Sequence, residues 1–186
     1  KNIDLASISA HKIYGLKGIG LLIKKEKLEI EPLIHGGKST TIYRSGTPPL
    51  PLIISIMKAI ELIIPNINEN NIYVKKLKDE LLDNIKDIPN IHINSTDNSI
   101  PEVINLSIKN IKPETFIHYL DSNDIYISTK SACSKVNEPS KSVYAVTKNI
   151  EYANNSLRIS LSHLTKEEDI DRFIDVFKKA VKELSL

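Results

Sequence analysis

The 186-residue sequence predicts a fold of the α/β class, with an α+β arrangement in its second part. Short apolar runs that are typical of strands alternate along the chain with longer stretches whose apolar residues recur at helical spacing. The last predicted element is a strongly amphipathic helix. A break in the pattern near residues 65–70 divides it into segments 1–67 and 68–186, and the second is close to the usual size of a small domain.

The first segment predicts two strands, a loop and a helix. Residues 3–9 alternate apolar and polar positions, and residues 19–23 form a continuous apolar run after a glycine-bounded turn, so both are typical of strands. Residues 33–48 are rich in Gly, Ser, Thr and Pro, and a loop of this length is often functional. The helix that follows is indicated by Leu52, Ile53, Ile56, Ala59, Ile60 and Ile63, and Pro65 is expected to end or kink it.

The second segment predicts four strands among helices. Its helices are expected at about 68–86, 112–121 and 139–147, and its strands at 91–93, 103–108, 125–127 and 157–161. The last helix carries the clearest signal, because Thr165 and Glu168 have the spacing of a capping box. Its buried face is formed by Ile170, Phe173, Ile174, Phe177, Val181 and Leu184.

Composition excludes several classes of function. The net charge of +2 and the scattered lysines do not favour direct nucleic-acid binding. No apolar run is expected to span a membrane, and the five histidines lack zinc-like spacing, so no metal site is predicted. A single cysteine cannot form an internal disulfide and suits a reducing compartment, so we expect the protein in the cytoplasm.

Two reactive side chains lie far apart in the sequence. Lys12 directly follows an apolar strand and has small neighbours, so partial desolvation is expected to favour an amine that attacks carbonyls. Cys133 lies between Lys130 and Lys135, which favour its thiolate. Each also has an ordinary alternative, since most lysines are solvated and most free cysteines are small buried residues.

Arg158 lies inside an apolar strand, where an arginine needs an anionic partner. A bound substrate carboxylate and a structural ion pair are equally good explanations at this stage.

Several short motifs together resemble the cysteine desulfurases of iron–sulfur cluster assembly, of the NifS and IscS type, within the fold-type I pyridoxal-phosphate enzymes. Their order and approximate spacing agree over the whole chain. The matching motifs are Ser9-Ala10-His11-Lys12, His35-Gly36-Gly37, Arg44-Ser45-Gly46-Thr47, Ser131-Ala132-Cys133 and Leu157-Arg158-Ile159-Ser160. The chain departs from the family pattern at Lys38, Thr40, Thr41 and Lys130.

The resemblance implies a role for each motif. It implies that Lys12 is the Schiff-base lysine of a pyridoxal 5'-phosphate site, with Ser9, Ala10 and His11 beside the cofactor. It also implies that Thr47 reaches the cofactor phosphate in the partner subunit of a homodimer. Arg158 is implied to bind the carboxylate of L-cysteine, and Cys133 to take the substrate sulfur as a persulfide and pass it to an acceptor protein.

The resemblance further implies the C-terminal part of a longer chain: residues 1–67 would end the sheet of the large cofactor domain, and residues 68–186 would form the small domain. The fragment alone is then expected to be catalytically poor. Two alternatives remain open at this point, namely another enzyme of the same fold, such as a selenocysteine lyase or an aminotransferase-like relative, and a non-catalytic binding module.

Overall fold

The computed structural model describes residues 2–37, 41–129 and 138–185. The chain divides into two compact units, Lys1–Ile67 and Asn68–Leu186.

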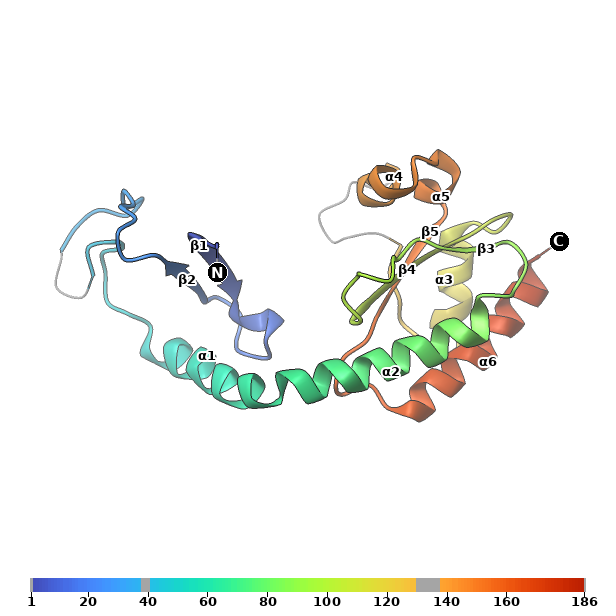
Figure 1. Ribbon diagram of the computed structural model, residues 1–186, viewed down its shortest axis with the longest axis horizontal. Coiled ribbons are helices and arrows are strands. Elements are labelled where there is room, and N and C mark those ends of the chain that lie inside the picture. The colour runs from blue at the N-terminus through green and yellow to red at the C-terminus, as the bar shows by residue number, and fades with distance from the viewer. Residues whose placement is uncertain (1, 38–40, 130–137, 186) are drawn as a thin grey trace. The chain divides into compact units, whose positions relative to one another are not determined.

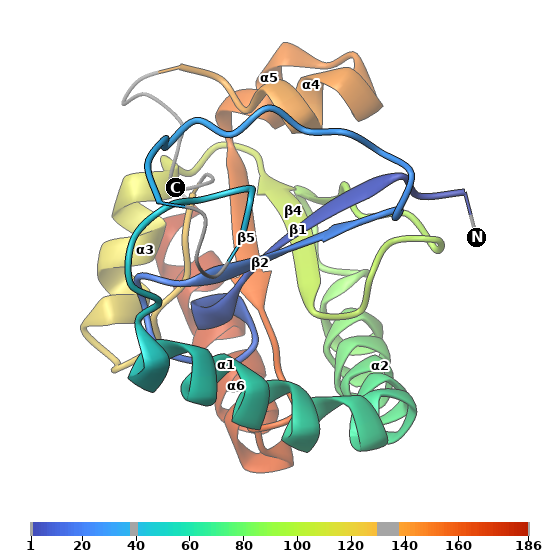
Figure 2. The same cartoon turned by 90° about the vertical axis from the view of Figure 1, so that its left-hand side faces the viewer.

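The first unit contains an antiparallel pair of strands, β1 (Leu5–Ser9) and β2 (Gly20–Lys24), which run side by side in Figure 2. A one-turn 3-10 helix, η1 (Ala10–Lys12), directly follows β1. The predicted alternation of apolar and polar residues thus gives a two-stranded ribbon whose end carries the reactive lysine.

A helix follows the long loop of the first unit. It is α1 (Leu50–Ile63), preceded by Pro48 and Pro49, and the backbone amide of Leu16 donates to the hydroxyl of Ser55 on it at 3.0 Å. The helix α1 ends at Ile63, as Pro65 led us to expect. Pro65 lies in a 3-10 turn, η2 (Ile64–Asn66), which leads directly into α2 (Ile67–Ile85). Proline is tolerated there because the first turn of a helix leaves its amide groups unbonded.

This helical stretch, Leu50–Ile85, is long and apolar enough to cross a membrane, with a mean hydropathy of 1.8 over its most apolar window. The expectation from the sequence that no apolar run is long enough to span a membrane is therefore wrong, as far as length and composition decide it. The evidence for a span is weak, since helices of other proteins pass the same test, and the stretch carries an ion pair between Lys58 and Glu61.

The second unit is built on a three-stranded antiparallel sheet in the order β3-β4-β5, formed by β3 (Ile91–Ile93), β4 (Val103–Ile108) and β5 (Ser156–Ser160). Side chains alternate between its two faces. One face is apolar and packs on α2, α3 (Pro113–Asp121) and α6 (Glu167–Leu184), as Figure 1 shows. The centre of this core contains Leu77, Leu81, Ile104, Leu106, Phe116, Leu120, Leu157 and Phe177, all fully buried.

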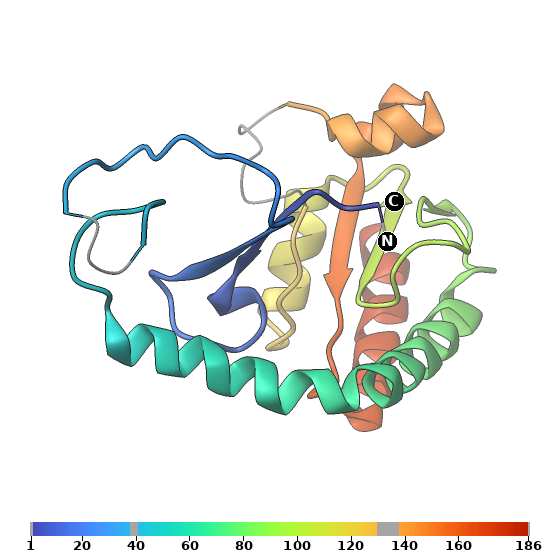
Figure 3. The ribbon, with the colours of Figure 1, turned by 60° about the vertical axis from the view of Figure 1, so that its left-hand side comes forward.

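The other face of the sheet is polar. It is partly covered by α5 (Ile150–Asn154), which follows α4 (Lys141–Thr147). The buried hydroxyl of Ser107 donates to the carbonyl of Tyr152 at 2.8 Å, and the rings of His92 and Tyr152 stack with their centroids 4.1 Å apart. Figures 1 and 3 both show α4 and α5 away from the side of the sheet that α2 and α6 cover.

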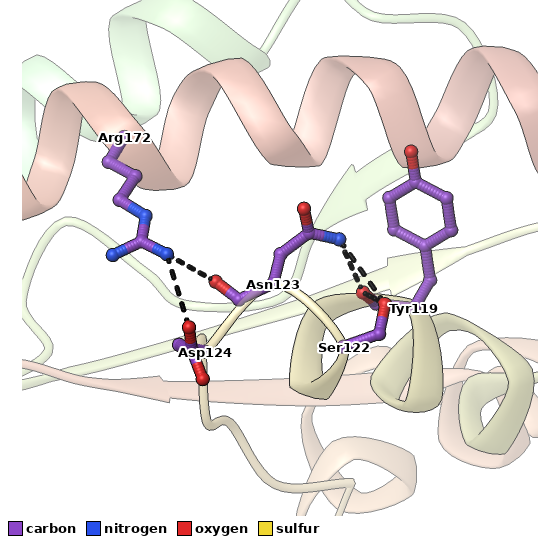
Figure 4. A network of polar contacts seen from close by, with 5 residues as sticks. All are labelled: Tyr119, Ser122, Asn123, Asp124 and Arg172. Carbon is purple, nitrogen blue, oxygen red and sulfur yellow. Dashed lines mark hydrogen bonds and ion pairs between the residues drawn. The ribbon is translucent and has the colours of Figure 1, made fainter.

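A polar network joins the end of α3 to α6 (Figure 4). Arg172 Nη2 donates to the carbonyl of Asn123 at 2.7 Å and pairs with Asp124 at 3.7 Å. The side chain of Asn123 in turn donates to the carbonyl of Tyr119 at 2.9 Å. The network closes the C-terminal end of α3, where backbone carbonyls have no partner within the helix.

Three details of the predicted elements need correction. Segment 125–127 is not a strand, because pairing is limited to one bridge between Ser128 and Arg158. The cap of the last helix is Lys166 rather than Thr165: the amide of Lys166 donates to Asp169, and the Thr165 hydroxyl accepts from Ser162 instead. The helix α5 was not predicted, since five residues are too short for a periodic signal.

Candidate functional site

The turn η1 brings the first set of predicted site residues together. Ser9 ends β1, and its side chain makes no capping bond to the turn. Ala10 is fully buried, and its carbonyl accepts from the amides of Ile13 and Gly15 at 3.0 and 2.9 Å. The backbone at Ala10 is therefore fixed, while Ser9, His11 and Lys12 present a hydroxyl, an imidazole and an amine around one turn.

Two glycines let the chain pack closely around this turn. A Cβ at Gly20 would lie 2.6 Å from the carbonyl oxygen of Ile8, and one at Gly15 would lie 3.1 Å from the Cβ of Ala10. Any other residue at Gly20 would have to push β1 and β2 apart. The close packing around the turn thus requires glycine at position 20 and small residues at positions 10 and 15.

Lys12 and His11 are both exposed. The partial desolvation that the sequence predicted for Lys12 is therefore not present among the described residues. A neighbouring chain or a bound group would have to supply it.

Thr47 lies in the loop before α1 and is also exposed. The described part of this loop is closed on itself, because the Ser45 hydroxyl donates to the carbonyl of His35 at 2.8 Å and the Ser45 amide donates to the carbonyl of Ile34 at 3.3 Å. Gly46 has a φ of +101°, which residues with a side chain rarely adopt. The glycine before Thr47 is thus required by the backbone.

Arg158 belongs to the second unit, on the polar face of the sheet. It lies directly opposite Asn105 of β4, and on its other side it forms the bridge with Ser128. Its Nε is buried and has no hydrogen-bond partner among the described residues. A buried donor of a charged group without an acceptor is costly, so Arg158 is a candidate residue for binding an anion.

Cys133 lies outside the described residues, as do Lys130 and Lys135. The segment that leads toward it is held at Ser128, five positions earlier in the sequence, by two backbone hydrogen bonds with Arg158 of 3.1 and 2.6 Å.

The residues of η1 fit a pyridoxal 5'-phosphate group by the chemistry of their donors. A hydroxyl and an imidazole can bind a phosphate, and a primary amine can hold an aldehyde. The observation that favours this fit is the hydroxyl of Ser9, which makes no capping bond and has no hydrogen-bond partner among the described residues.

Four polar residues that accompany Arg158 were not predicted from the sequence. These are Asn94, Asn105, Ser107 and Ser128. The signal was present in Ile104-Asn105-Leu106-Ser107-Ile108, where polar and apolar residues alternate strictly. The contacts among these residues, however, depend on the register of three strands.

Comparison with known proteins supports the resemblance. The family model described as "Aminotransferase class-V" matches residues 1–173. The chain is 36% identical over 185 residues to "Cysteine desulfurase IscS" of Methanosarcina thermophila and 38% identical over 187 residues to the protein of that name from Clostridium botulinum strain Kyoto. These alignments cover 98% of this chain and 46% and 47% of the relatives, so the chain spans about half of their length.

Solved structures agree with the sequence relatives. A structure titled "NIFS-LIKE PROTEIN" superposes with a TM-score of 0.84 at 29% identity, over 98% of this chain and 47% of the other. A NifS-like protein from Rickettsia africae gives 0.82 at 31% identity, over 97% and 48%. The expected fold, the C-terminal part of this enzyme architecture, is thereby confirmed, and the chain belongs to the class-V aminotransferase family.

Proposed function

We propose that the complete protein is a pyridoxal-phosphate-dependent cysteine desulfurase, which takes sulfur from L-cysteine and releases L-alanine. Family membership and relatives that bear this name support the reaction class. The observation that carries the proposal is the buried Nε of Arg158, which lacks an acceptor among the described residues. A planar guanidinium on a polar sheet face suits the carboxylate of an amino acid.

The first unit would hold the cofactor. In this proposal Lys12 binds it through its amine, Ser9 and His11 contact its phosphate beside Ala10, and Thr47 reaches the phosphate in a partner subunit. Pyridoxal phosphate, when bound, withdraws electrons from the substrate and so weakens the bond between carbon and sulfur. When it is not bonded to the cofactor, the amine of Lys12 would also serve to move a proton to or from the substrate.

Cys133 would receive the sulfur. Its thiolate attacks the sulfur of L-cysteine, so that a sulfur–sulfur bond forms while the carbon–sulfur bond breaks. The electron pair of the broken bond stays with the carbon fragment, which takes up a proton and leaves as L-alanine. The protein keeps a persulfide, and no external oxidant is needed. We propose that an acceptor protein of iron–sulfur cluster assembly or tRNA thiolation then takes this sulfur.

A homodimer in the cytoplasm is part of the same proposal. The helix α1 presents large exposed apolar side chains, including Ile54, Met57 and Leu62, each at least half exposed. Apolar groups gathered on one helix are typical of surfaces that pack against another protein surface.

The test uses the full-length protein with L-cysteine and a reductant. We expect sulfide and L-alanine in equal amounts, and we expect Cys133→Ala and Lys12→Ala each to abolish sulfide release. If the parent protein yields L-alanine from L-selenocysteine but releases no sulfide from L-cysteine, the protein is a lyase of the same fold. If the full-length protein neither binds pyridoxal phosphate nor consumes L-cysteine, the proposal is wrong and a binding module remains.

A further inference from the structure

The polar face of the sheet contains one continuous row of side chains across four segments. Asn94, just after β3, lies beside Asn105 of β4, since its amide donates to the carbonyl of Asn105 at 2.9 Å. Asn105 lies opposite Arg158 of β5, and Arg158 lies opposite Ser128. Side chains at directly opposed positions of adjacent strands share a face and can interact. The row therefore places an amide side chain next to the arginine of the proposed substrate site.

Asn105 and Arg158 form the closer of the two kinds of antiparallel pair. Backbone hydrogen bonds join Ile108 to Asn155 and Leu161 to Glu102. Since such pairs alternate along the ladder, the pair of Asn105 and Arg158 falls between them and exchanges no backbone bonds. Side chains of these pairs lie closer together than those of hydrogen-bonded pairs.

A chain of hydrogen bonds fixes which way the Asn105 amide faces. It begins at the backbone carbonyl of Tyr152, which can only accept a hydrogen bond. The Ser107 hydroxyl therefore donates its single proton to this carbonyl, at 2.8 Å. The atom of Asn94 that lies 2.7 Å from the Ser107 oxygen must then be its donor, Nδ2. The same Nδ2 lies 2.8 Å from Asn105, whose facing atom must be the acceptor Oδ1.

In this orientation the side-chain nitrogen of Asn105 has no hydrogen-bond partner among the described residues and can donate away from β3. Its oxygen is held on the side of Asn94, and its two N–H groups are available on the side where Arg158 lies. Asn94 is only 9% exposed and Ser107 is fully buried, so the chain that sets the orientation is shielded from water. The Oδ1 of Asn94 has no partner among the described residues, a cost that the fold bears to keep this arrangement.

We propose that Asn105 is a second donor to the substrate carboxylate, beside Arg158, and that Asn94 is the residue that positions it. This inference rests on the proposed function, and it deepens it by naming how the site selects an α-carboxylate. The guanidinium and the amide together offer donors from two adjacent strands to one planar anion. Ser107 contributes only by directing Asn94.

The experiment compares two compounds in the full-length, cofactor-loaded protein: L-cysteine, and L-cysteinamide, which lacks the carboxylate. KM is measured for L-cysteine and the inhibition constant for L-cysteinamide. We expect Asn105→Ala to raise KM for L-cysteine about ten-fold or more, as for a lost hydrogen bond to a charged group, with kcat changed less than about two-fold. The inhibition constant of L-cysteinamide should not change.

Further variants separate recognition from folding. Asn105→Asp, which has nearly the same size, should raise KM at least as much, because its carboxylate would pair with Arg158. Asn94→Leu should raise KM in the same direction by a smaller factor. Asn84→Ala is the matched control and should behave as the parent, because Asn84 is an exposed asparagine on α2 whose side chain donates to the Glu80 carbonyl.

The outcomes are distinguishable. The inference is overturned if Asn105→Ala weakens the binding of L-cysteine and L-cysteinamide by the same factor. It is also overturned if KM for L-cysteine is unchanged in both Asn105→Ala and Asn105→Asp. If Arg158→Ala raises KM for L-cysteine while both Asn105 variants do not, the proposed function stands and this inference alone is wrong. If Arg158→Ala also leaves KM unchanged, or the parent protein releases no sulfide, the proposed substrate site itself is wrong.

Discussion

Ser128 and Arg158 exchange two backbone hydrogen bonds, of 3.1 and 2.6 Å, outside any extended strand pairing. This bridge joins the arginine of the proposed substrate site to the segment that leads toward Cys133. Both bonds involve the backbone, so the identity of residue 128 matters through its amide rather than its side chain.

Ser128→Pro removes the amide that donates to the Arg158 carbonyl. We expect the free energy of unfolding to fall by about 1–3 kcal/mol, as for a buried acceptor left without its donor. Ser128→Ala keeps the amide and should lie within about 0.5 kcal/mol of the parent. Urea titrations of the two variants measure this, and equal losses in both would contradict a backbone role.

Gly20→Ala should weaken the ribbon that carries Lys12. The added Cβ would lie 2.6 Å from the carbonyl oxygen of Ile8, so the two strands must separate, at a cost of about 1–3 kcal/mol. Gly37→Ala is the control, since a Cβ there meets nothing within 4 Å. Thermal unfolding of both variants gives the comparison, and a Gly20→Ala protein as stable as the parent would mean that the strands can shift freely.

Lys12→Ala should remove the visible absorption band that forms when the protein binds pyridoxal phosphate, because Lys12 is the lysine of the turn η1, where the cofactor is proposed to bind. Titration with the cofactor at fixed protein concentration measures it. Lys17→Ala, another exposed lysine of the same unit, should keep the band. A band that is equally strong without Lys12 would show that other lysines react and that the assignment is wrong.

Phe177→Ala should destabilise the second unit by about 3–5 kcal/mol. Phe177 is fully buried, and its ring lies 5.1 Å from Phe116 and 5.4 Å from Phe173, so truncation leaves a cavity beneath the sheet. Phe177→Leu retains most of the volume and should cost less than half as much. Denaturant unfolding, followed by circular dichroism, tests the order of the two effects.

Tyr119 predicts a pH dependence of stability. A hydrogen bond to the Glu183 carboxylate raises the pKa of the Tyr119 phenol above its usual value of 10.0, and partial desolvation adds to the effect. Below pH 10 the Tyr119 phenol is protonated in both states, and its hydrogen bond contributes fully to the free energy of unfolding. Above pH 10 the phenol ionises first in the unfolded chain, so the free energy of unfolding falls until the phenol of the folded protein ionises too.

Unfolding midpoints between about pH 9 and pH 11.5 measure this loss. Tyr119→Phe should reduce the slope, while Tyr126→Phe, a well-exposed tyrosine, should leave it unchanged. The same slope in all three proteins would mean that the bond to Glu183 does not form in solution.

The spacing of apolar and polar residues predicted those helices and strands that are specified by their own stretch of sequence. The last helix was predicted from the apolar spacing of residues such as Ile170, Phe173 and Phe177, and only its cap was placed one residue early. Thr165 was misassigned because its hydroxyl bonds Ser162, a choice that depends on the preceding loop. Apolar alternation at Ile125 and Ile127 indicated a strand. Both side chains pack against the core, but their segment pairs with a neighbouring strand only through the bridge at Ser128.

The site could be predicted only as isolated residues. Chemistry and resemblance singled out Lys12 and Arg158, but the partners of Arg158 come from strands that are distant in sequence. The bond from Asn94 to Asn105 exists because β3 and β4 pair in one register, which composition and periodicity do not specify.

The strict alternation on β4 and β5 has a consequence for how the gene can change. Deleting or inserting one residue at the start of β5 would turn Arg158 toward the apolar core and bring Leu157 and Ile159 to the polar face. The same change at the start of β4 would turn Asn105 toward the core. A point substitution changes one side chain of this sheet and leaves the others on their faces, so it can be tolerated. A length change within a strand moves several side chains to the wrong face at once, so we expect it not to be tolerated. Relatives that vary in length should do so in the connecting loops.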